Sequence, residues 1–279
     1  MIPKTIHYIW VGGKPLPPLA KKCIESWKKF CPDYEIIKWD ETNFDISTSR
    51  YCKEAYGAKK FAFVSDYIRL HVLVNHGGVY MDTDVELLKP IDGYLIHQAF
   101  SGFENEKSIP TGIMACEKGF PLFHDLLSEY IKRSFILSNG KLNLMTNVRY
   151  ITKACSKRGL VLNNSLQTVD GFTLYPNDFF CPKSHSSGKY NITERTVAIH
   201  HFAGSWVSES EQKIIKERYD FYKKYGNDEY LIHIYKRSVD TIGLKELYRV
   251  MVKRTIDRIF RKKLGWIKTK NDLSYNTKN

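Results

Sequence analysis

The chain has 279 residues and a formal net charge of +13, from 43 basic and 30 acidic residues. This length fits a single α/β domain with additional helices, and an aromatic content of 14% excludes a largely disordered chain. The six cysteines form no Cys-x-x-Cys pair, the first residues carry no apolar signal segment, and no apolar run approaches the ~20 residues of a membrane helix. We therefore expect reduced thiols in a cytoplasmic protein that does not span a bilayer.

The basic excess is concentrated near the C-terminus. Lys245–Lys270 contains ten basic and two acidic residues, a net charge of +8, which leaves +5 for the rest of the chain. Apolar residues at near-helical spacing over 244–267 predict a helix, either packed on the domain with a solvated basic face or lying on an anionic membrane surface. Because this charge lies outside the motif-bearing region, we expect no nucleic-acid partner. The non-enzymatic alternative is a basic module that binds a membrane or a nucleic acid without catalysis.

Predicted strands and helices alternate through the first two thirds of the chain. Strands are expected at 5–11, 34–39, 79–81, 172–175 and 196–202, and helices at 17–30, 59–75, 121–135, 142–157 and 209–225. Such alternation favours one α/β sheet domain over 1–206. A helical extension over 207–268 and a frayed tail over 269–279 are expected to follow.

Two aspartates follow the strand predicted at 79–81. Asp82 and Asp84 come at its carboxyl end, where open α/β sheets bind their ligands. Carboxylates at i and i+2 can converge on Mg²⁺ or Mn²⁺ if the backbone turns there. An isolated Asp-x-Asp pattern is weak, but the preceding helix and buried strand favour a metal-diphosphate site.

The helix predicted over 59–75 carries a charged pair among apolar residues. Asp66 and Arg69 are three residues apart and share a helical face, with Ser65 beside them. An exposed ion pair would contribute little to stability. Because the flanking residues are apolar, we expect the pair to be buried and to bind sugar hydroxyls.

Two further motifs sit next to glycines. His200 and His201 end a predicted strand, and one of them could complete the metal shell, since strand alternation sends them to opposite faces. Trp10 ends the first strand beside Gly12 and Gly13. It is either a core residue or a ring on which a nucleobase stacks.

Four motifs in this order resemble glycosyltransferase family 32: residues 2–10, residues 62–69, residues 77–84, and His200-His201 followed by Ser205-Trp206. This family includes capsular-polysaccharide transferases and fungal initiating mannosyltransferases, and is similar to the glucosylating domains of large clostridial toxins. The resemblance covers residues 2 to about 206. It implies a Rossmann-like nucleotide-binding sheet of the GT-A kind, a Mn²⁺ or Mg²⁺ cofactor, and retention of anomeric configuration.

The resemblance also implies roles for individual residues. Asp66, Arg69, Asp82 and Asp84 would be the catalytic residues, with Asp82, Asp84 and His201 holding the metal. Donor binding would use a wider set of residues. Trp10 would stack on the base, and Asp66 and Arg69, with Ser65 in the same region, would hold sugar hydroxyls. Tyr80 and Asp82 would face the nucleotide, and Ser205 and Trp206 would close over the diphosphate.

The expected function is a retaining transfer of a hexose from a nucleotide sugar, preferably a uridine diphosphate sugar, to a saccharide or lipid-linked acceptor. Surface polysaccharide synthesis at the inner membrane face is the expected setting. A metal-dependent phosphohydrolase is one alternative, although Val85-Glu86 after the aspartates departs from the usual pattern of those enzymes. A toxin-like protein glucosyltransferase is the other.

Overall fold

The computed structural model describes residues 1–109, 112–204, 212–213, 216–217 and 219–220. The chain divides into two compact units, Met1–Lys216 and Glu217–Asn279. Ser205, Trp206 and the basic segment predicted at 244–267 lie outside the described residues. In the part of the chain that is described, no helix is both long enough and apolar enough to cross a bilayer.

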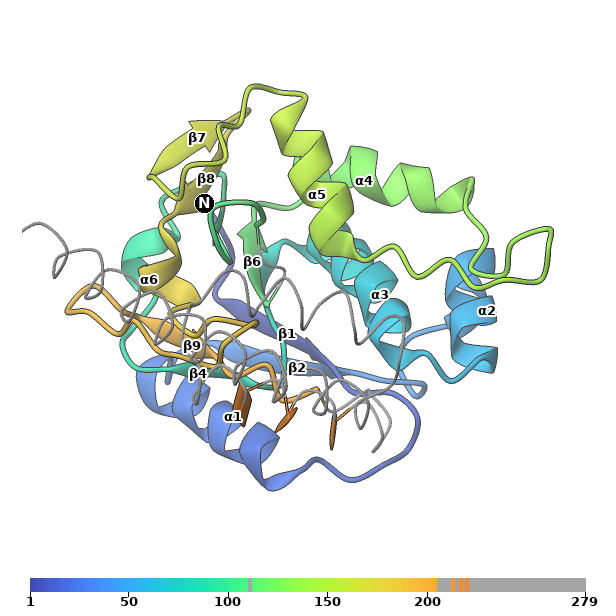
Figure 1. Cartoon of the computed structure of the whole chain (residues 1–279), viewed down its shortest axis with the longest axis horizontal. Coiled ribbons are helices and arrows are strands. Elements are labelled where there is room, and N and C mark those ends of the chain that lie inside the picture. The colour runs from blue at the N-terminus through green and yellow to red at the C-terminus, as the bar shows by residue number, and fades with distance from the viewer. Residues whose placement is uncertain (110–111, 205–211, 214–215, 218, 221–279) are drawn as a thin grey trace, which may run out of the picture. The chain divides into compact units, whose positions relative to one another are not determined.

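A seven-stranded mixed sheet forms the centre of the first unit (Figure 1), with the strand order β2-β1-β3-β6-β5-β8-β7. Its strands are β1 (Thr5–Ile9), β2 (Glu35–Trp39), β3 (Gly78–Met81), β5 (Ala99–Gly102), β6 (Ile113–Cys116), β7 (Gln167–Val169) and β8 (Phe172–Tyr175). A second, two-stranded sheet pairs β4 (Val85–Leu87) with β9 (Ala198–His200). The predicted α/β class is confirmed.

Six α-helices are described: α1 (Pro18–Phe30), α2 (Arg50–Gly57), α3 (Phe61–His76), α4 (Pro121–Ile131), α5 (Asn147–Ser156) and α6 (Asn177–Phe180). Short 3₁₀ turns span Ile46–Thr48 and Asp92–Tyr94. Figure 1 shows α1 on one side of the large sheet and α2, α3, α4 and α5 on the other.

Two hydrophobic cores lie against the two faces of the large sheet. Along β3, Val79 and Met81 join the core that contains Trp27 of α1, whereas Tyr80 between them joins the core of α3 and α4. Side chains alternate between faces along a strand, so a short, fully buried strand supplies both cores. The same alternation turns Tyr80 toward Arg69 on α3, with the guanidinium 4.6 Å from the ring centroid.

Two glycines end α3 and start β3. Gly77 has φ 70° and Gly78 has φ 94°, in the left-handed region that favours glycine. A Cβ on Gly77 would lie 2.7 Å from the Lys118 backbone nitrogen, and one on Gly78 would lie 2.7 Å from the Thr5 carbonyl oxygen. The chain can therefore reverse from helix to central strand only with glycine here.

The strand directions bring several carboxyl ends to one edge of the sheet. β1 is parallel to β2 and β3, β6 is antiparallel to both β3 and β5, and β8 is parallel to β5. β1, β3, β5 and β8 therefore end at the same edge. Asp82 and Asp84 follow β3 directly at this edge, which is where such sheets bind ligands.

Candidate functional site

The aspartates that follow β3 lie beside a histidine from β9. His200 Nε2 lies 3.3 Å from Asp84 Oδ1 and 3.7 Å from Asp82 Oδ2. One ligand atom from each of the three residues lies within 4.8 Å of the others. A turn closed by the hydrogen bond from the Val85 N–H to the Asp82 carbonyl at 2.9 Å brings both carboxylates to one place.

Pairing of β4 with β9 fixes this arrangement. In the antiparallel register Val85 is opposite His200, so the imidazole lies next to the residue that follows Asp84. The Ala203 backbone N–H donates to Asp84 Oδ2 at 2.7 Å and holds that carboxylate in place. A Cβ on Gly112 would lie 2.7 Å from His200 Nδ1, so glycine at 112 leaves room for the ring.

The imidazole of His201, the histidine predicted as a metal ligand, pairs with Glu86 rather than with the two aspartate carboxylates, although the His201 backbone N–H donates to the Asp84 carbonyl at 2.9 Å. Its Nε2 is 2.8 Å from Glu86 Oε2, and Glu86 also pairs with Lys22 at 2.8 Å. β9 ends at His200, whose imidazole lies beside the aspartates, whereas the imidazole of the next residue, His201, reaches Glu86. The structure therefore places the imidazole of His200, and not that of the predicted His201, beside the two aspartates.

The charges of Asp84 and His200 stabilise each other. Burial alone would raise the pKa of Asp84, but the neighbouring imidazolium and the Ala203 N–H lower it to about 2. Burial likewise opposes protonation of His200, yet the carboxylates of Asp84 and Asp82 raise its pKa well above the ordinary value. A protonated imidazole here occupies the place that a cation would take between the same carboxylates.

Arg69 connects this cluster to α3. Its Nη2 lies 3.3 Å from both Asp66 Oδ1 and Asp82 Oδ1, and Nε donates to the Ser65 carbonyl at 3.2 Å. Nη2 also donates to Ser65 Oγ at 3.1 Å. The Tyr80 hydroxyl donates to Asp82 Oδ1 at 2.5 Å, so the predicted residues Ser65, Asp66, Arg69, Tyr80, Asp82 and Asp84 form one connected group.

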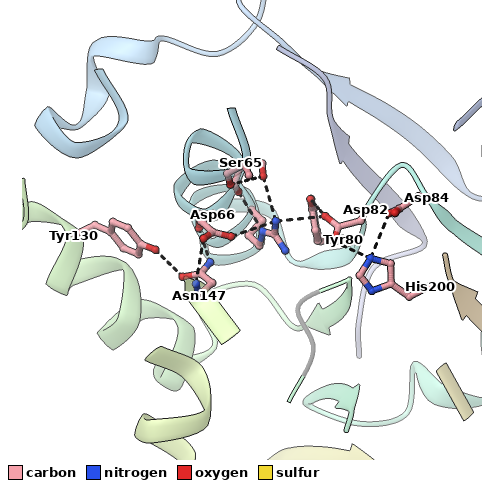
Figure 2. Close-up of polar contacts among 10 residues, drawn as sticks. Ser65, Asp66, Tyr80, Asp82, Asp84, Tyr130, Asn147 and His200 are labelled. Carbon is pink, nitrogen blue, oxygen red and sulfur yellow. Dashed lines mark hydrogen bonds and ion pairs between the residues drawn. The ribbon is translucent and has the colours of Figure 1, made fainter. Parts of the chain in front are cut away.

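Asp66 is buried, with 7% of its surface exposed, and burial raises its pKa to about 6 although Arg69 opposes this shift. Asn147 at the start of α5 contacts it twice: the backbone N–H donates to Asp66 Oδ2 at 3.1 Å, and Nδ2 donates to the Asp66 carbonyl at 2.6 Å. The Tyr130 hydroxyl of α4 donates to Asn147 Oδ1 at 2.6 Å. Figure 2 shows these contacts running from Tyr130 to His200.

Asn147 and Tyr130 were not predicted from the sequence. Asn147 lies inside a segment with apolar helical spacing, and no local motif marks it. Only the tertiary contact between the first residue of α5 and α3 brings it to Asp66. Glu104, two residues beyond β5 at the edge shared with β3, was also missed; it is partly buried, and burial raises the pKa of its carboxyl despite the nearby His200.

Trp10 lies in the core on the α1 side of the sheet, with 9% of its surface exposed, and its Nε1 donates to the Lys14 carbonyl at 2.5 Å. The glycines Gly12 and Gly13 follow it with φ of 90° and 69°. The indole thus stays near a glycine turn at the carboxyl end of β1, as the sequence predicts. Base stacking by this ring stays a prediction.

A divalent cation fits the chemistry of the three clustered side chains. Carboxylate oxygens are the ligands that Mg²⁺ and Mn²⁺ prefer, and one imidazole nitrogen is compatible with Mn²⁺. The cation could displace the proton of His200 and then be bound by Asp82, Asp84 and His200, whose ligand atoms are already close together.

Comparison with known families agrees with this geometry. The family profile described as "Glycosyltransferase sugar-binding region containing DXD motif" matches residues 17–101, which include Asp82-Thr83-Asp84. Residues 17–101 of the chain therefore resemble the sugar-binding region of the DXD-containing glycosyltransferases. The matched segment also contains Ser65, Asp66 and Arg69, so most of the connected group lies within the region that resembles a sugar-binding region.

The chain is similar to two curated proteins over part of their length. It is 25% identical over 170 residues to "Subversion of eukaryotic traffic protein A" of Legionella pneumophila, covering 48% of this chain and 26% of that protein. It is 26% identical over 132 residues to "Inositol phosphoceramide mannosyltransferase 3" of Schizosaccharomyces pombe, covering 43% and 35%. The aligned segments thus span about a quarter to a third of these relatives.

Among solved structures, the "PaToxG Glycosyltransferase" is similar, with a TM-score of 0.45 and 18% identity over 56% of this chain and 69% of that chain. A likeness of this degree adds no argument about donor or acceptor. Those questions depend on the site residues themselves.

Proposed function

We propose that the protein is a retaining glycosyltransferase that transfers a hexose from a nucleotide sugar with the help of a divalent cation. The observation that carries the proposal is the junction of two groups at one sheet edge. The possible metal ligands Asp82, Asp84 and His200 are joined through Arg69 to the buried carboxylate of Asp66. A donor that has both a diphosphate and a sugar would need both groups.

We assign the cation, preferably Mn²⁺, to Asp82, Asp84 and His200. When bound it would neutralise negative charge on the departing nucleoside diphosphate. Arg69, fixed by Asp66, Asp82 and Ser65, would add a positive charge that needs no reorganisation during the reaction. Ser205 and Trp206, outside the described residues, are proposed to close over the same diphosphate.

Asp66 and Arg69 are proposed to hold hydroxyls of the donor sugar. A buried carboxylate accepts hydrogen bonds strongly from hydroxyls because the local dielectric constant is low. Trp10 is proposed to stack on the base, which we expect to be uracil in a uridine diphosphate sugar. Mannosyl transfer, named for the Schizosaccharomyces relative, makes guanosine diphosphate mannose the first competing donor.

The proposed acceptor is a saccharide or a lipid-linked saccharide used in surface polysaccharide synthesis, at the cytoplasmic face of the membrane. The relative named for inositol phosphoceramide supports a lipid-bearing acceptor class. A protein acceptor, as in the toxin glucosyltransferases that the motifs resemble, would instead produce sugar attached to protein side chains. Mass spectrometry of the product separates the two.

The test is a panel of uridine and guanosine diphosphate sugars with Mn²⁺, scored by release of nucleoside diphosphate and by thermal shift. We expect one donor to be hydrolysed slowly in the presence of Mn²⁺ and not in its absence. Asp84→Asn should abolish this hydrolysis, whereas the exposed Asp33→Asn should not change it. Binding of no nucleotide sugar, or release of inorganic phosphate from the donor, would overturn the proposal.

A further inference from the structure

The segment from α4 to β8 carries basic residues without acidic ones. Residues 130–169 contain no Asp or Glu and seven basic residues: Lys132, Arg133, Lys141, Arg149, Lys153, Lys157 and Arg158. Arg133 pairs with Glu129, and Arg158 pairs with Asp125 and Asp170. Within the described part of the chain, the other five lie within ion-pair distance of no carboxylate. This segment therefore has a net positive charge that the described residues do not neutralise.

Three of these cations form a stripe along α5. Arg149, Lys153 and Lys157 are four residues apart, so they lie on one face of the helix, and all three are exposed. Ile151 and Cys155 on the other face are buried. The helix thus packs with one side and presents a basic side to solvent.

Exposed apolar side chains lie at the N-terminal end of the same helix. The connection over residues 132–146, which we call the α4–α5 hairpin, contains Ile136, Leu137 and Leu144, which are 40%, 41% and 58% exposed. Leu144 is followed by Met145, which is 37% exposed. These exposed apolar side chains lie close in sequence to Lys141 and Arg149, and several exposed apolar side chains in one short segment are unusual on a surface that faces only water.

The α4–α5 hairpin is held in place by contacts with α2 and by a hydrogen bond within the hairpin. Phe135 is fully buried, with its ring centroid 5.4 Å from that of Tyr51. The Ile136 N–H donates to Glu54 Oε2 of α2 at 2.8 Å, and the Leu137 N–H donates to the Lys141 carbonyl at 2.8 Å. The apolar side chains are therefore exposed on an anchored hairpin, which can present them without first being ordered.

We propose that the α5 stripe and the α4–α5 hairpin form a docking surface for an anionic lipid membrane. Lys and Arg side chains on one helix face suit the negative headgroups, and the neighbouring Ile, Leu and Met side chains suit the boundary of the acyl region. A nucleic acid would use the cations but has no apolar region for these exposed side chains. The combination of the two features is what favours lipid.

The docking surface is connected to the glycosyltransferase site by α5 itself. Asn147, the first residue of α5, donates its two hydrogen bonds to Asp66. A membrane held against this helix would bring a lipid-linked acceptor close to the donor sugar, a consequence that rests on the proposed function. Membrane binding itself does not rest on it, because it depends only on charge and exposed apolar surface.

The first test measures sedimentation of the full chain with phosphatidylcholine vesicles that contain or lack phosphatidylserine, in the absence of any nucleotide sugar. We expect binding to the anionic vesicles only. The triple variant Arg149→Gln, Lys153→Gln, Lys157→Gln should bind them about a hundredfold more weakly, or about fivefold for each basic residue. The matched control Lys21→Gln, Lys28→Gln, Lys29→Gln removes the same charge from α1, across the sheet, and should bind nearly as wild type does.

The second test reports the location directly. All six native cysteines are buried, so a cysteine introduced at Leu144 can be labelled with a fluorophore sensitive to polarity. Anionic vesicles should shift its emission to the blue. The same label at Ile192, which is 55% exposed in a distant loop, should not shift.

These outcomes separate the alternatives. Absence of vesicle binding would overturn the proposal. Vesicle binding that survives the α5 substitutions and leaves the Leu144 label unchanged would also overturn it. That result would assign the membrane contact to another part of the chain, such as 244–267. Retention by single-stranded RNA but not by vesicles would assign the basic face to nucleic acid. Neither test contains a nucleotide sugar. A negative result in these tests therefore says nothing about the proposed transfer reaction, which the donor panel tests separately.

Discussion

Asn147 holds Asp66 through two hydrogen bonds, from its backbone N–H to Asp66 Oδ2 at 3.1 Å and from Nδ2 to the Asp66 carbonyl at 2.6 Å. The side chain of Asn147 is buried, and its Oδ1 accepts the Tyr130 hydroxyl at 2.6 Å. The start of α5 therefore fixes the rotamer and position of the proposed sugar-binding carboxylate. Helices α3 and α5, whose contacting residues are 81 positions apart in sequence, together hold the Asp66 carboxylate.

Asn147→Ala should weaken the affinity for the nucleotide sugar more than the affinity for the nucleoside diphosphate. The substitution leaves the Tyr130 hydroxyl and the Asp66 carbonyl without this partner, so unfolding should also become easier by about 1–3 kcal/mol. Calorimetry with both ligands, together with thermal melts, measures the two effects. Asn139→Ala, at an exposed position in the α4–α5 hairpin, is the control; equal affinities for both ligands in wild type and Asn147→Ala would contradict a positioning role.

Comparison of the two adjacent histidines tests the metal site. His200→Ala should reduce Mn²⁺ affinity by more than the 10–100-fold that typically follows loss of an outer-shell partner. His201→Ala should leave it close to that of wild type, because His201 contacts Glu86 instead. Titration calorimetry with Mn²⁺ and nucleoside diphosphate gives both numbers. Similar losses in the two variants would mean that neither histidine binds the ion directly.

Trp10→Ala should lower the affinity for the nucleoside diphosphate by about 1–3 kcal/mol if the indole stacks on the base. Because Trp10 is largely buried, truncation will also remove core packing. Trp10→Phe keeps an aromatic ring and should retain most of the affinity. If Trp10→Ala melts at a lower temperature but binds the nucleoside diphosphate normally, the ring has a structural role only.

The sequence predicted the helices and strands whose apolar pattern is long or is delimited by glycines. The helix expected over 59–75 is Phe61–His76, and the strand expected at 79–81 is Gly78–Met81. The strands Ala99–Gly102 and Ile113–Cys116 were missed. Each has four residues buried on both faces, so neither shows the alternation that marks a strand. Both lie at the centre of the sheet, where long-range pairing rather than local pattern decides the structure.

The prediction over 142–157 was wrong at its start for a different reason. Leu142, Leu144 and Met145 extend the apolar spacing of α5, but the helix begins at Asn147 and the earlier residues belong to the α4–α5 hairpin. The pattern therefore counted two exposed residues, Leu144 and Met145, as core residues. The position of His200 beside Asp84 could not be predicted for a similar reason, because alternation separates the two histidines but only the pairing of β4 with β9 decides which imidazole faces Asp84.

The raised pKa of Asp66 predicts a pH-dependent difference in stability. Burial raises this pKa from 3.8 to about 6, so the folded protein binds the proton more tightly than the unfolded chain does. The resulting stabilisation is fully present below about pH 4 and is lost as pH rises through about 6. Asp66→Asn removes this titration without changing side-chain size.

The melting temperature of Asp66→Asn relative to wild type should therefore rise between pH 4 and pH 7. Melts of both proteins without metal or nucleotide measure the difference, and Asp125→Asn, at an exposed position, is the control for general effects of charge. A difference that stays constant over this pH range would show that Asp66 does not change its protonation on unfolding.

The last prediction separates a sugar site from a nucleotide site. If Asp66 accepts hydrogen bonds from donor hydroxyls, Asp66→Ala should cost more for the intact nucleotide sugar than for the nucleoside diphosphate, which lacks those hydroxyls. A charge-assisted hydrogen bond contributes about 1.5–3 kcal/mol, so the difference should be at least about tenfold in dissociation constant. Calorimetry with each ligand and Mn²⁺ measures it, and a thermal melt of the same variant reports the loss of structure.

A buried ion pair with only a structural role predicts a different result. In Asp66→Ala, Arg69 would lose a partner 3.3 Å away and shift relative to Asp82, which it also contacts at 3.3 Å. Both ligands would then bind more weakly by the same factor, and the melting temperature would fall. Equal losses for the two ligands would therefore place Asp66 in the support of Arg69 rather than in contact with the sugar.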